Sequence, residues 1–390
     1  MGEKMKESFN YKESLISFVH ENVDWLIENE KLENRTIVFY GITEAHNVAI
    51  KYLKEHNFDV YAIIDNNPAR KNLAINGVEV LPPKEVLFPY NSKFAILIGG
   101  NYYDEMLKQL QNWGYIDNIN IFRIFNPVEA INNIVDPNFL IINSTEEKDI
   151  QLNALKYLKA KCIEAGIEYY LAYGTLIGAV RHNGFIPWDN DIDVYMYERD
   201  MLKLYDVINQ NDEYELLLPG ITKDYIQLTP LLINKKTVTY RVDFPFVCQT
   251  GVGIDIMTMV NLGNVKEEAA LFINDSYSQE KLFKQRLLKS DSFEECLPEL
   301  KECLNYSRKK EQESSKYVGV MYGQTYGLKN IYKSEWFIQK DEKFENETFT
   351  VPGGYDSLLS QIYGNYMKLP PESERNAQNH PWKNYWKMIE

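Results

Sequence analysis

The sequence predicts two domains, an α/β domain with a parallel sheet followed by a larger α+β domain. Three observations support this prediction. The chain has 390 residues, whereas one domain usually holds roughly 100–200. Between residues 36 and 125, short apolar runs alternate with helical patterns, which is typical of a parallel sheet. Beyond residue 150, the order becomes strand, Gly-Thr turn, short helix, loop and acidic strand.

The charge balance bears on the kind of partner. Acidic residues number 56 and basic residues 42, so the net charge is −14 and the isoelectric point is near 5.0. Such a chain repels the phosphates of nucleic acid and the surface of an anionic membrane. We therefore expect no nucleic-acid partner. The 45% hydrophobic content is enough to bury a core and excludes wholesale disorder.

Cysteines and apolar runs indicate the cellular compartment. The four cysteines include no C-x-x-C pair and no adjacent histidine cluster, which disfavours structural zinc and a disulfide framework. Buried thiols in a reducing compartment are expected instead. The first residues lack the apolar core of a signal peptide, and no apolar run reaches the ~18 residues of a membrane span. The expected location is the cytoplasm. Any membrane contact would be peripheral, at the inner face, and made through a bound substrate.

Residues 1–34 predict a leading amphipathic helix. A docked helix is expected, while a dimer-forming or membrane-surface helix is the alternative, and the acidic polar face argues against the membrane. Self-association into a homo-oligomer stays open. Apolar side chains recur at mostly helical spacing at Phe9, Leu15, Ile16, Phe18, Val19, Val23, Leu26 and Ile27.

Residues 35–125 predict the parallel-sheet domain. Strands are expected at 36–40, 60–65, 94–100 and 119–125, and helices at 45–55 and 102–113. This order resembles the small Rossmann-type modules attached to many bacterial polysaccharide-biosynthesis proteins.

A dinucleotide site needs G-x-G-x-x-G after the first strand. The turn from Gly41 to His46 has one glycine, and Glu44 there would repel a phosphate. We therefore expect no nicotinamide cofactor. Asp65 fits either an ordinary turn or a ribose contact, and residues 99–101 fit either a tight loop or an anion-binding turn.

A linker that ends in a helix start is predicted over residues 126–149, and the second domain over residues 150–390. The helix is expected from about Glu146 to Ala165, closed by Gly166. Within the second domain, Asp191 and Asp193 alternate with apolar residues, so both are expected on one face of a strand, with Asp189 at the strand entrance. Paired carboxylates repel unless a cation lies between them, and an all-oxygen site suits Mg²⁺ or Mn²⁺. Asp255, flanked by isoleucines, is expected to project to the same edge from a neighbouring strand.

A Gly-Thr turn, an Asp-x-Asp strand and one later acid form the pattern of the nucleotidyltransferase superfamily. The segment from Gly174 to Asp193 closely resembles the hallmark of the LicD family, which includes fukutin and fukutin-related protein. The resemblance implies a nucleotidyltransferase-like catalytic domain and transfer of a phospho-alcohol group from a CDP-activated donor to a glycan. It also implies a metal held by Asp191 and Asp193. Asn183 replaces a frequent basic residue and Asn190 a frequent acid.

Several residues of this segment are candidates for substrate binding, beginning with the Gly174-Thr175 pair. Thr175 either binds a phosphate or caps the short helix. Arg181 offers a bidentate fork to a phosphate, or forms a salt bridge to a neighbouring aspartate. His182 either orients a substrate or lies on the surface. Trp188 either stacks on a cytosine or sugar ring or packs to shape the acidic loop.

The resemblance continues over residues 343–375, with F-E, a Val-Pro turn, Y-G-x-Y-M, a double proline and an arginine. Glu345 is either a base or ligand for the acceptor hydroxyl, or makes a structural bond near the turn at 352–354. Arg375 either pairs with donor phosphate or is a surface charge. Asn365 stands where an aspartate is common. We expect Tyr363, Tyr366 and Trp336 to be packing residues of the fold and not ligands of a substrate.

These observations predict a LicD-like phosphotransferase that depends on a CDP-alcohol. It would act in polysaccharide biosynthesis, such as that of a capsule or a teichoic acid. Its partners would be a CDP-alcohol donor and a glycan or lipid-linked glycan acceptor. Asp255 would complete the metal site or act as the general base. A nucleotidyltransferase that leaves the nucleoside monophosphate on the acceptor is the first alternative, and a catalytically silent scaffold is the second. A scaffold is expected to lack the acidic pair, which is present here.

Overall fold

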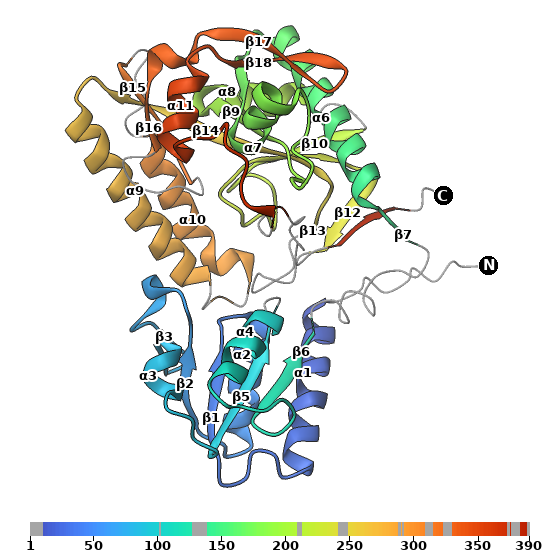
Figure 1. Ribbon diagram of the computed structural model, residues 1–390, viewed down its shortest axis with the longest axis vertical. Coiled ribbons are helices and arrows are strands. Elements are labelled where there is room, and N and C mark those ends of the chain that lie inside the picture. The colour runs from blue at the N-terminus through green and yellow to red at the C-terminus, as the bar shows by residue number, and fades with distance from the viewer. Residues whose placement is uncertain are drawn as a thin grey trace. The chain divides into compact units, whose positions relative to one another are not determined.

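The computed structural model describes residues 11–100, 103–126, 139–208, 213–240, 249–287, 290, 292–308, 315–322, 330–372, 375 and 383–387. The chain divides into two compact units (Figure 1). The first holds the described residues up to 126, and the second holds most of those from 139 onward. The predicted boundary at residue 150 falls inside a helix of this second unit.

The first unit is built on a six-stranded sheet in the order β3-β4-β2-β1-β5-β6. All neighbouring strands are parallel except β3 and β4. The predicted parallel sheet is therefore confirmed. The short strands β3 and β4 were not predicted, because two to four residues show little periodicity. The strands are β1 Thr36–Tyr40, β2 Val60–Ile64, β3 Ala74–Ile75, β4 Val78–Leu81, β5 Phe94–Gly99 and β6 Ile121–Phe125.

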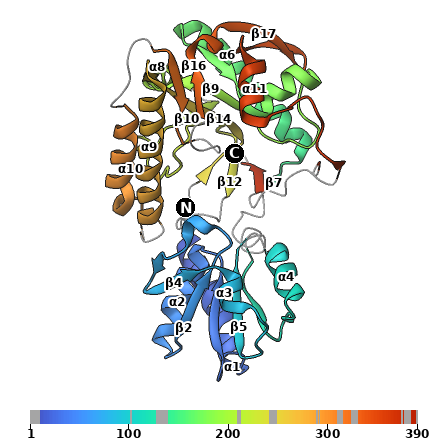
Figure 2. The same ribbon diagram turned by 60° about the vertical axis from the view of Figure 1, so that its left-hand side comes forward.

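Helices cover this sheet, as Figure 2 shows for α2, α3 and α4. The leading helix α1 packs on α2 and β6, and its Val19 and Val23 are fully buried. The structure thus shows the leading helix docked on its own unit, as expected. The helices are α1 Tyr11–Glu28, α2 Glu44–Glu55, α3 Pro83–Leu87 and α4 Tyr103–Asn112, with a 3₁₀ turn at Pro68–Arg70.

Side chains join the carboxyl ends of β1 and β5, where the strand order reverses. The Thr43 hydroxyl donates to the Gly99 carbonyl at 2.6 Å. The Gly99 N–H donates to His46 Nε2 at 2.8 Å, so this nitrogen is the acceptor of a neutral imidazole. Burial lowers the pKa of His46 to about 3. His46 is therefore a neutral structural residue at this junction.

A pH dependence of stability follows from His46. The unfolded chain binds a proton at His46 below pH ~6.5, whereas the folded chain does not until about pH 3. His46 therefore reduces the free energy of unfolding as pH falls, by up to ~1.4 kcal/mol per pH unit below 6.5. Denaturant unfolding between pH 7 and pH 5 should show a steeper loss for the wild type than for His46→Gln. Equal slopes would contradict this prediction.

The second unit opens with helix α6, Ser144–Ala165. Asn143 and Glu146 form a reciprocal capping box at its start, and Gly166 ends it in a left-handed conformation with φ of 62°. The helix end predicted at Gly166 is confirmed. The helix starts at Ser144, two residues before the predicted Glu146, because its capping residue is Asn143.

A seven-stranded mixed sheet forms the centre of this unit. The long strand β14 pairs with β9 in parallel and with β11 and β15 antiparallel. Its strands are β8 Tyr169–Leu171, β9 Asp193–Tyr197, β10 Tyr214–Leu217, β11 Leu231–Asn234, β14 Gly253–Gly263, β15 Tyr317–Val320 and β16 Ile331–Lys333. A four-stranded sheet contains β7 Leu140–Ile141, β12 Thr237–Tyr240, β13 Gln249–Thr250 and β19 Lys383–Trp386. A two-stranded hairpin consists of β17 Gln339–Phe344 and β18 Glu347–Pro352.

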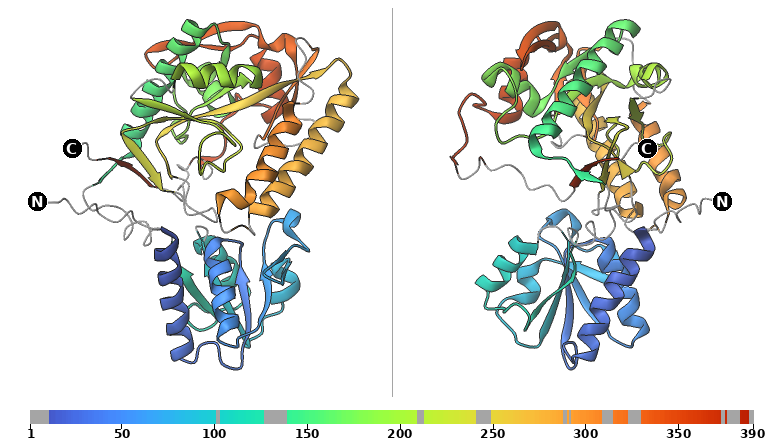
Figure 3. Two further views of the ribbon diagram at one scale, coloured as in Figure 1. Left: turned by 180° about the vertical axis from the view of Figure 1, so that it is seen from behind. Right: turned by 90° about the vertical axis from the view of Figure 1, so that its right-hand side faces the viewer.

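Helices α9 and α10 lie side by side in every view, including both views of Figure 3. Phe272 of α9 stacks on Tyr306 of α10 at 5.1 Å between ring centroids. Over the described residues, no helix is long and apolar enough to cross a membrane. The helical segments are α7 Tyr173–Ile177, a π-helical turn Gly178–His182, α8 Glu198–Ile208, α9 Lys266–Leu287, α10 Phe293–Arg308, a 3₁₀ turn Ser334–Phe337 and α11 Tyr355–Tyr363.

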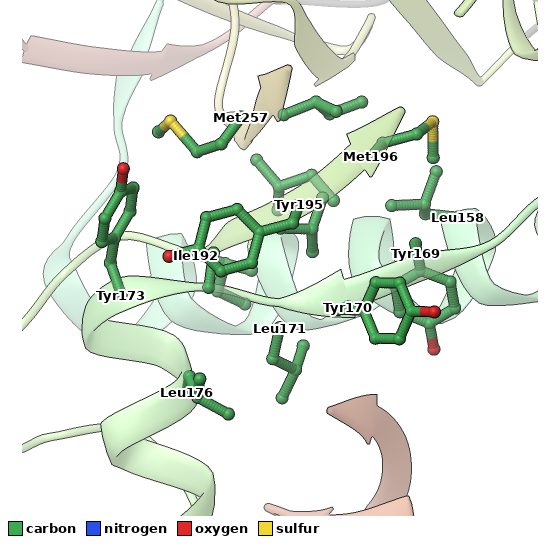
Figure 4. Packing of buried hydrophobic residues seen from close by; sticks show 14 of the residues in the cluster. Leu158, Tyr169, Tyr170, Leu171, Tyr173, Leu176, Ile192, Tyr195, Met196 and Met257 are labelled. Atoms are coloured by element: carbon green, nitrogen blue, oxygen red, sulfur yellow. The ribbon is translucent and has the colours of Figure 1, made fainter. Parts of the chain in front are cut away.

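Aromatic side chains fill the core beside β9 (Figure 4). Tyr195 of β9 contacts Tyr173 at the start of α7, with ring centroids 5.3 Å apart. The thiols of Cys162, Cys296 and Cys303 are buried and free, as expected, whereas Cys248 lies outside the described residues. This packing fixes the start of β9, where the acidic motif lies.

Candidate active site

The acidic motif lies at the start of β9, next to β14. Asp193 is the first residue of β9 and is paired with Asp255 in the parallel ladder. Paired residues on adjacent strands, which lie ~4.8 Å apart, project to the same face. Asp255 therefore comes from the neighbouring strand, as expected. Strand β9 starts at Asp193, two residues later than predicted, so Asp191 precedes the strand. Its pairing with β14 begins only where the Asp255 N–H donates to the Ile192 carbonyl.

Asp193 is the most buried of these carboxylates, with 7% of its surface exposed. Its backbone N–H donates to Thr175 Oγ1 at 2.9 Å. Within the described part of the chain, its carboxylate makes no hydrogen bond. Burial first, and then the charges of Asp191, Asp255 and Asp189, raise the pKa of Asp193. A buried carboxylate among like charges is costly unless a cation compensates it.

Asp189 belongs to the same cluster. Burial raises the pKa of Asp189 to about 7, and the charge of Asp191 and a hydrogen bond with it add to this effect. Gly174 makes room for this carboxylate, because a Cβ at position 174 would meet Asp189 Oδ2 at 2.2 Å. Gly174, in α7, is thus the residue whose missing side chain leaves space for the Asp189 carboxylate.

Thr175 does not cap the short helix, which corrects one of its two predicted roles. Ala172 is the residue before the helix, and Thr175 is the third residue inside α7. Its side chain is 4% exposed, and its hydroxyl accepts the Asp193 N–H. The residue therefore positions the acidic strand, because it holds the backbone of Asp193. A phosphate contact by this buried hydroxyl has no support in the structure.

Arg181 and His182 lie side by side on the π-helical turn after α7. Arg181 Nη1 donates to the Tyr366 carbonyl, and Arg181 Nε lies 3.4 Å from His182 Nδ1. Among the described residues, Arg181 has no ion pair with an aspartate, so the predicted salt bridge is wrong. Burial, together with the charge of Arg181, lowers the pKa of His182. The guanidinium is therefore a partly buried cation held by the Tyr366 carbonyl.

Trp188 packs between two basic residues. The His182 ring meets Trp188 edge-on, with centroids 6.1 Å apart, and the Arg375 guanidinium lies over Trp188 at 5.6 Å. Arg375 Nε donates to the Pro370 carbonyl at 2.7 Å. Trp188 also packs against the core. The structure thus brings Arg181, His182, Trp188 and Arg375 together beside the acidic loop.

Glu345 makes a structural bond, but not at the predicted place. Its Oε1 accepts the Phe185 N–H at 2.9 Å, and its own N–H donates to the Asn183 carbonyl. It therefore holds the loop inserted before the acidic strand, and not the turn at 352–354. Gly184 permits this approach, because a Cβ there would meet Glu345 Oε1 at 2.2 Å. This bond makes Glu345 an anchor of the loop through its Oε1.

Two neighbours of the acidic cluster were missed by sequence reasoning. Burial and the charge of Asp191 raise the pKa of Glu147, on α6, to about 7. Burial and the charges of Asp193, Asp189 and Asp191 raise the pKa of Tyr363, which was expected only to pack. Neither residue is marked by a local pattern. Glu147 reads as an ordinary acid in the first turn of a helix, and Tyr363 as one of 28 tyrosines.

The donor set of this cluster suits a hard divalent cation, since all its side chains are carboxylates. The buried carboxylate of Asp193, which makes no hydrogen bond to the described residues, is the observation that fits a cation best. Among the described residues, however, no three Asp, Glu, His or Cys side chains are gathered closely enough to hold a metal ion as they stand. Binding would therefore need rotation of the aspartate side chains on their fixed backbone positions.

Comparisons with known proteins agree with the motif. Residues 166–289 match the family model described as LicD/FKTN/FKRP, nucleotidyltransferase domain. Lipopolysaccharide cholinephosphotransferase LicD of Haemophilus influenzae is 27% identical over 251 residues, which cover 60% of this chain and 95% of that protein. Human ribitol 5-phosphate transferase FKRP is 41% identical over 46 residues, or 12% of this chain and 9% of that protein.

Proposed function

We propose, from the LicD-family nucleotidyltransferase domain that this chain carries over residues 166–289, that the protein is a phosphotransferase of glycan modification. The proposed reaction moves a phospho-alcohol group, such as phosphocholine or a polyol phosphate, from a CDP-activated donor to a glycan hydroxyl. The two relatives, a cholinephosphotransferase and a ribitol 5-phosphate transferase, support this substrate class.

The observation that carries the proposal is the in-register pair Asp193 and Asp255 beside Asp191 and Asp189. Mg²⁺ or Mn²⁺ bound there would offset charge on the donor pyrophosphate and on the leaving cytidine monophosphate. Asp191, Asp193 and Asp255 are the residues proposed to hold it. Asp255 has the alternative role of accepting the proton of the acceptor hydroxyl as its oxygen bonds to phosphorus.

The basic and aromatic group beside the acidic loop is proposed to bind the donor. Arg181 has one guanidinium nitrogen on the Tyr366 carbonyl, which leaves further N–H donors for a phosphate. The Trp188 ring, already covered on one side by Arg375, would contact the cytosine or the sugar. His182 would orient the donor.

The test is direct assay with CDP-choline, CDP-ribitol and CDP-glycerol in Mg²⁺ or Mn²⁺. Release of cytidine monophosphate from at least one donor is expected, with mass spectrometry showing the phospho-alcohol on the acceptor or on water. An acceptor that carries the nucleoside monophosphate would favour the nucleotidyltransferase alternative. If no donor is turned over, with or without a glycan acceptor, the protein would instead be a catalytically silent scaffold.

The first unit is proposed to be a Rossmann-like module without catalytic residues. Its parallel strands follow the order β4-β2-β1-β5-β6, in which the direction of winding changes between β1 and β5. We expect it to position the transferase, to self-associate or to recognise a sugar nucleotide.

Nicotinamide dinucleotides are expected not to bind this unit. The turn after β1 offers Thr43 and Glu44 in place of glycines, and Thr43 already bonds to Gly99 across the junction. Bulky side chains and a negative charge at the start of α2 oppose a pyrophosphate. Calorimetric titration of the full chain with NAD and NADP should show no micromolar binding. Saturable tight binding of either would contradict this prediction and indicate a bifunctional enzyme.

A further inference from the structure

A chain of hydrogen bonds from the carboxyl-terminal strand fixes Glu147, one helical turn before Gln151, whose Nε2 donates to the carbonyl of Asn190, next to Asp191, at 2.9 Å. Thr239 Oγ1, on β12, donates to Asn384 Oδ1, on β19, at 2.6 Å. Asn384 Nδ2 donates to Glu147 Oε1, on α6, at 2.7 Å. Thr239 is 5% exposed and Asn384 8% exposed. Three elements that are distant in sequence thus fix one oxygen of Glu147.

The strands around Asn384 hold it rigidly. β19 lies between β12 and β7 in a four-stranded sheet, and the Asn384 carbonyl accepts the Ile142 N–H at 2.9 Å. Both the backbone and the side chain of Asn384 are therefore fixed. The Glu147 carboxylate cannot turn away from its position without breaking this partly buried hydrogen bond.

A purely structural role does not require a charge at position 147. A neutral glutamine would accept the same hydrogen bond from Asn384, whereas a partly buried carboxylate near Asp191 adds repulsion. The structure nevertheless holds this carboxylate in place. The unbonded, buried carboxylate of Asp193 lies in the same cluster and independently favours a cation there.

We infer that Glu147 is a further carboxylate of the acidic centre, whose negative charge strengthens divalent-cation binding at the Asp191 end. Asn384 and Thr239 are positioning residues that act through Glu147. The inference rests on the proposed metal site. Glu147 and Asn384 both lie outside the segment matched by the family model, so the family motif does not include them.

The test exchanges the two hydrogen-bonding side chains. In the double variant Glu147→Gln with Asn384→Asp, the new amide at position 147 donates to the new carboxylate at position 384, and the Thr239 hydroxyl still donates to position 384. The hydrogen-bond chain is kept, while the charge moves one hydrogen bond away from Asp191. Glu147→Gln alone is the second variant. The control is Glu164→Gln, at the exposed far end of the same helix.

The measurements are the Mn²⁺ dissociation constant, from electron paramagnetic resonance of free Mn²⁺, and the melting temperature without metal. We expect the exchange to weaken Mn²⁺ binding by ~10-fold or more, as for residues that support metal ligands, with a melting temperature close to that of the wild type. Glu147→Gln should weaken binding similarly, and Glu164→Gln should not.

Two results would overturn the inference. Unchanged Mn²⁺ affinity in a folded exchange variant, or in Glu147→Gln, would show that the charge serves only the hydrogen-bond chain. In that case Mn²⁺ binding by the wild type would still leave the proposed function intact. A wild-type protein that binds no Mn²⁺ would remove the metal-dependent proposal and this inference together.

Discussion

Replacing Asp193 with asparagine is expected to reduce donor cleavage by roughly 10²–10³-fold or more, the effect of removing one group that stabilises transition-state charge. The variant keeps the size of the side chain and the backbone N–H that bonds to Thr175. It loses the buried charge that faces Asp255 across the strand pair. Asp191→Asn is expected to act in the same direction.

Stability should move the opposite way. Because the pKa of Asp193 is raised on folding, its ionised form destabilises the metal-free protein above the unfolded pKa of ~3.9. Asparagine removes this cost, so the melting temperature of Asp193→Asn in EDTA should equal or exceed that of the wild type. Loss of activity with unchanged or higher stability would separate a functional carboxylate from a structural one.

The matched control is Asp224→Asn, on an exposed loop, in a backbone conformation with φ of 61° that asparagine tolerates. Its activity should equal that of the wild type. Removal of metal is the second arm of the experiment. Wild-type enzyme in excess EDTA should lose activity and regain it with Mg²⁺ or Mn²⁺. Full activity in EDTA, or in Asp193→Asn, would rule out the proposed role of these carboxylates.

Replacing Gly174 with alanine is expected to lower activity by roughly 10²-fold, the cost of a displacement of about 1 Å at a reacting group. The new Cβ would meet Asp189 Oδ2 at 2.2 Å, a distance that no pair of unbonded atoms tolerates. Asp189 must then turn away from its place beside Asp191. The acidic centre is thereby rearranged while the helix itself accepts alanine readily.

A double-mutant cycle identifies the cause of this loss. Asp189→Ala removes the atom that the new methyl group meets. In that background, Gly174→Ala should cost little further activity, because the two changes act on one contact. Additive losses would mean that Gly174 acts independently of Asp189, for instance through backbone approach of a phosphate.

Several features of this protein are determined by local sequence. Alternating apolar runs specify the parallel strands β1, β2, β5 and β6, because a buried strand needs only its own apolar side chains to be recognised. The Asn143 to Glu146 box and Gly166 delimit α6 for the same reason, since capping groups bond within one helical turn. The Asp-x-Asp motif likewise marks the start of the acidic strand, although only Asp193 lies within the strand and Asp191 precedes it.

The tertiary structure decided what each side chain touches. Glu345 bonds to the loop at Phe185, 160 positions away, and Thr175 bonds to the backbone of Asp193 in place of a helix end. Asn384 reaches Glu147 across 237 positions. No pattern in the sequence encodes these partners, because strand order and register are set by how the whole apolar core packs. The sequence alone therefore identified the aspartates, Asp189 included, while the fold added Glu147 and Tyr363 to their surroundings.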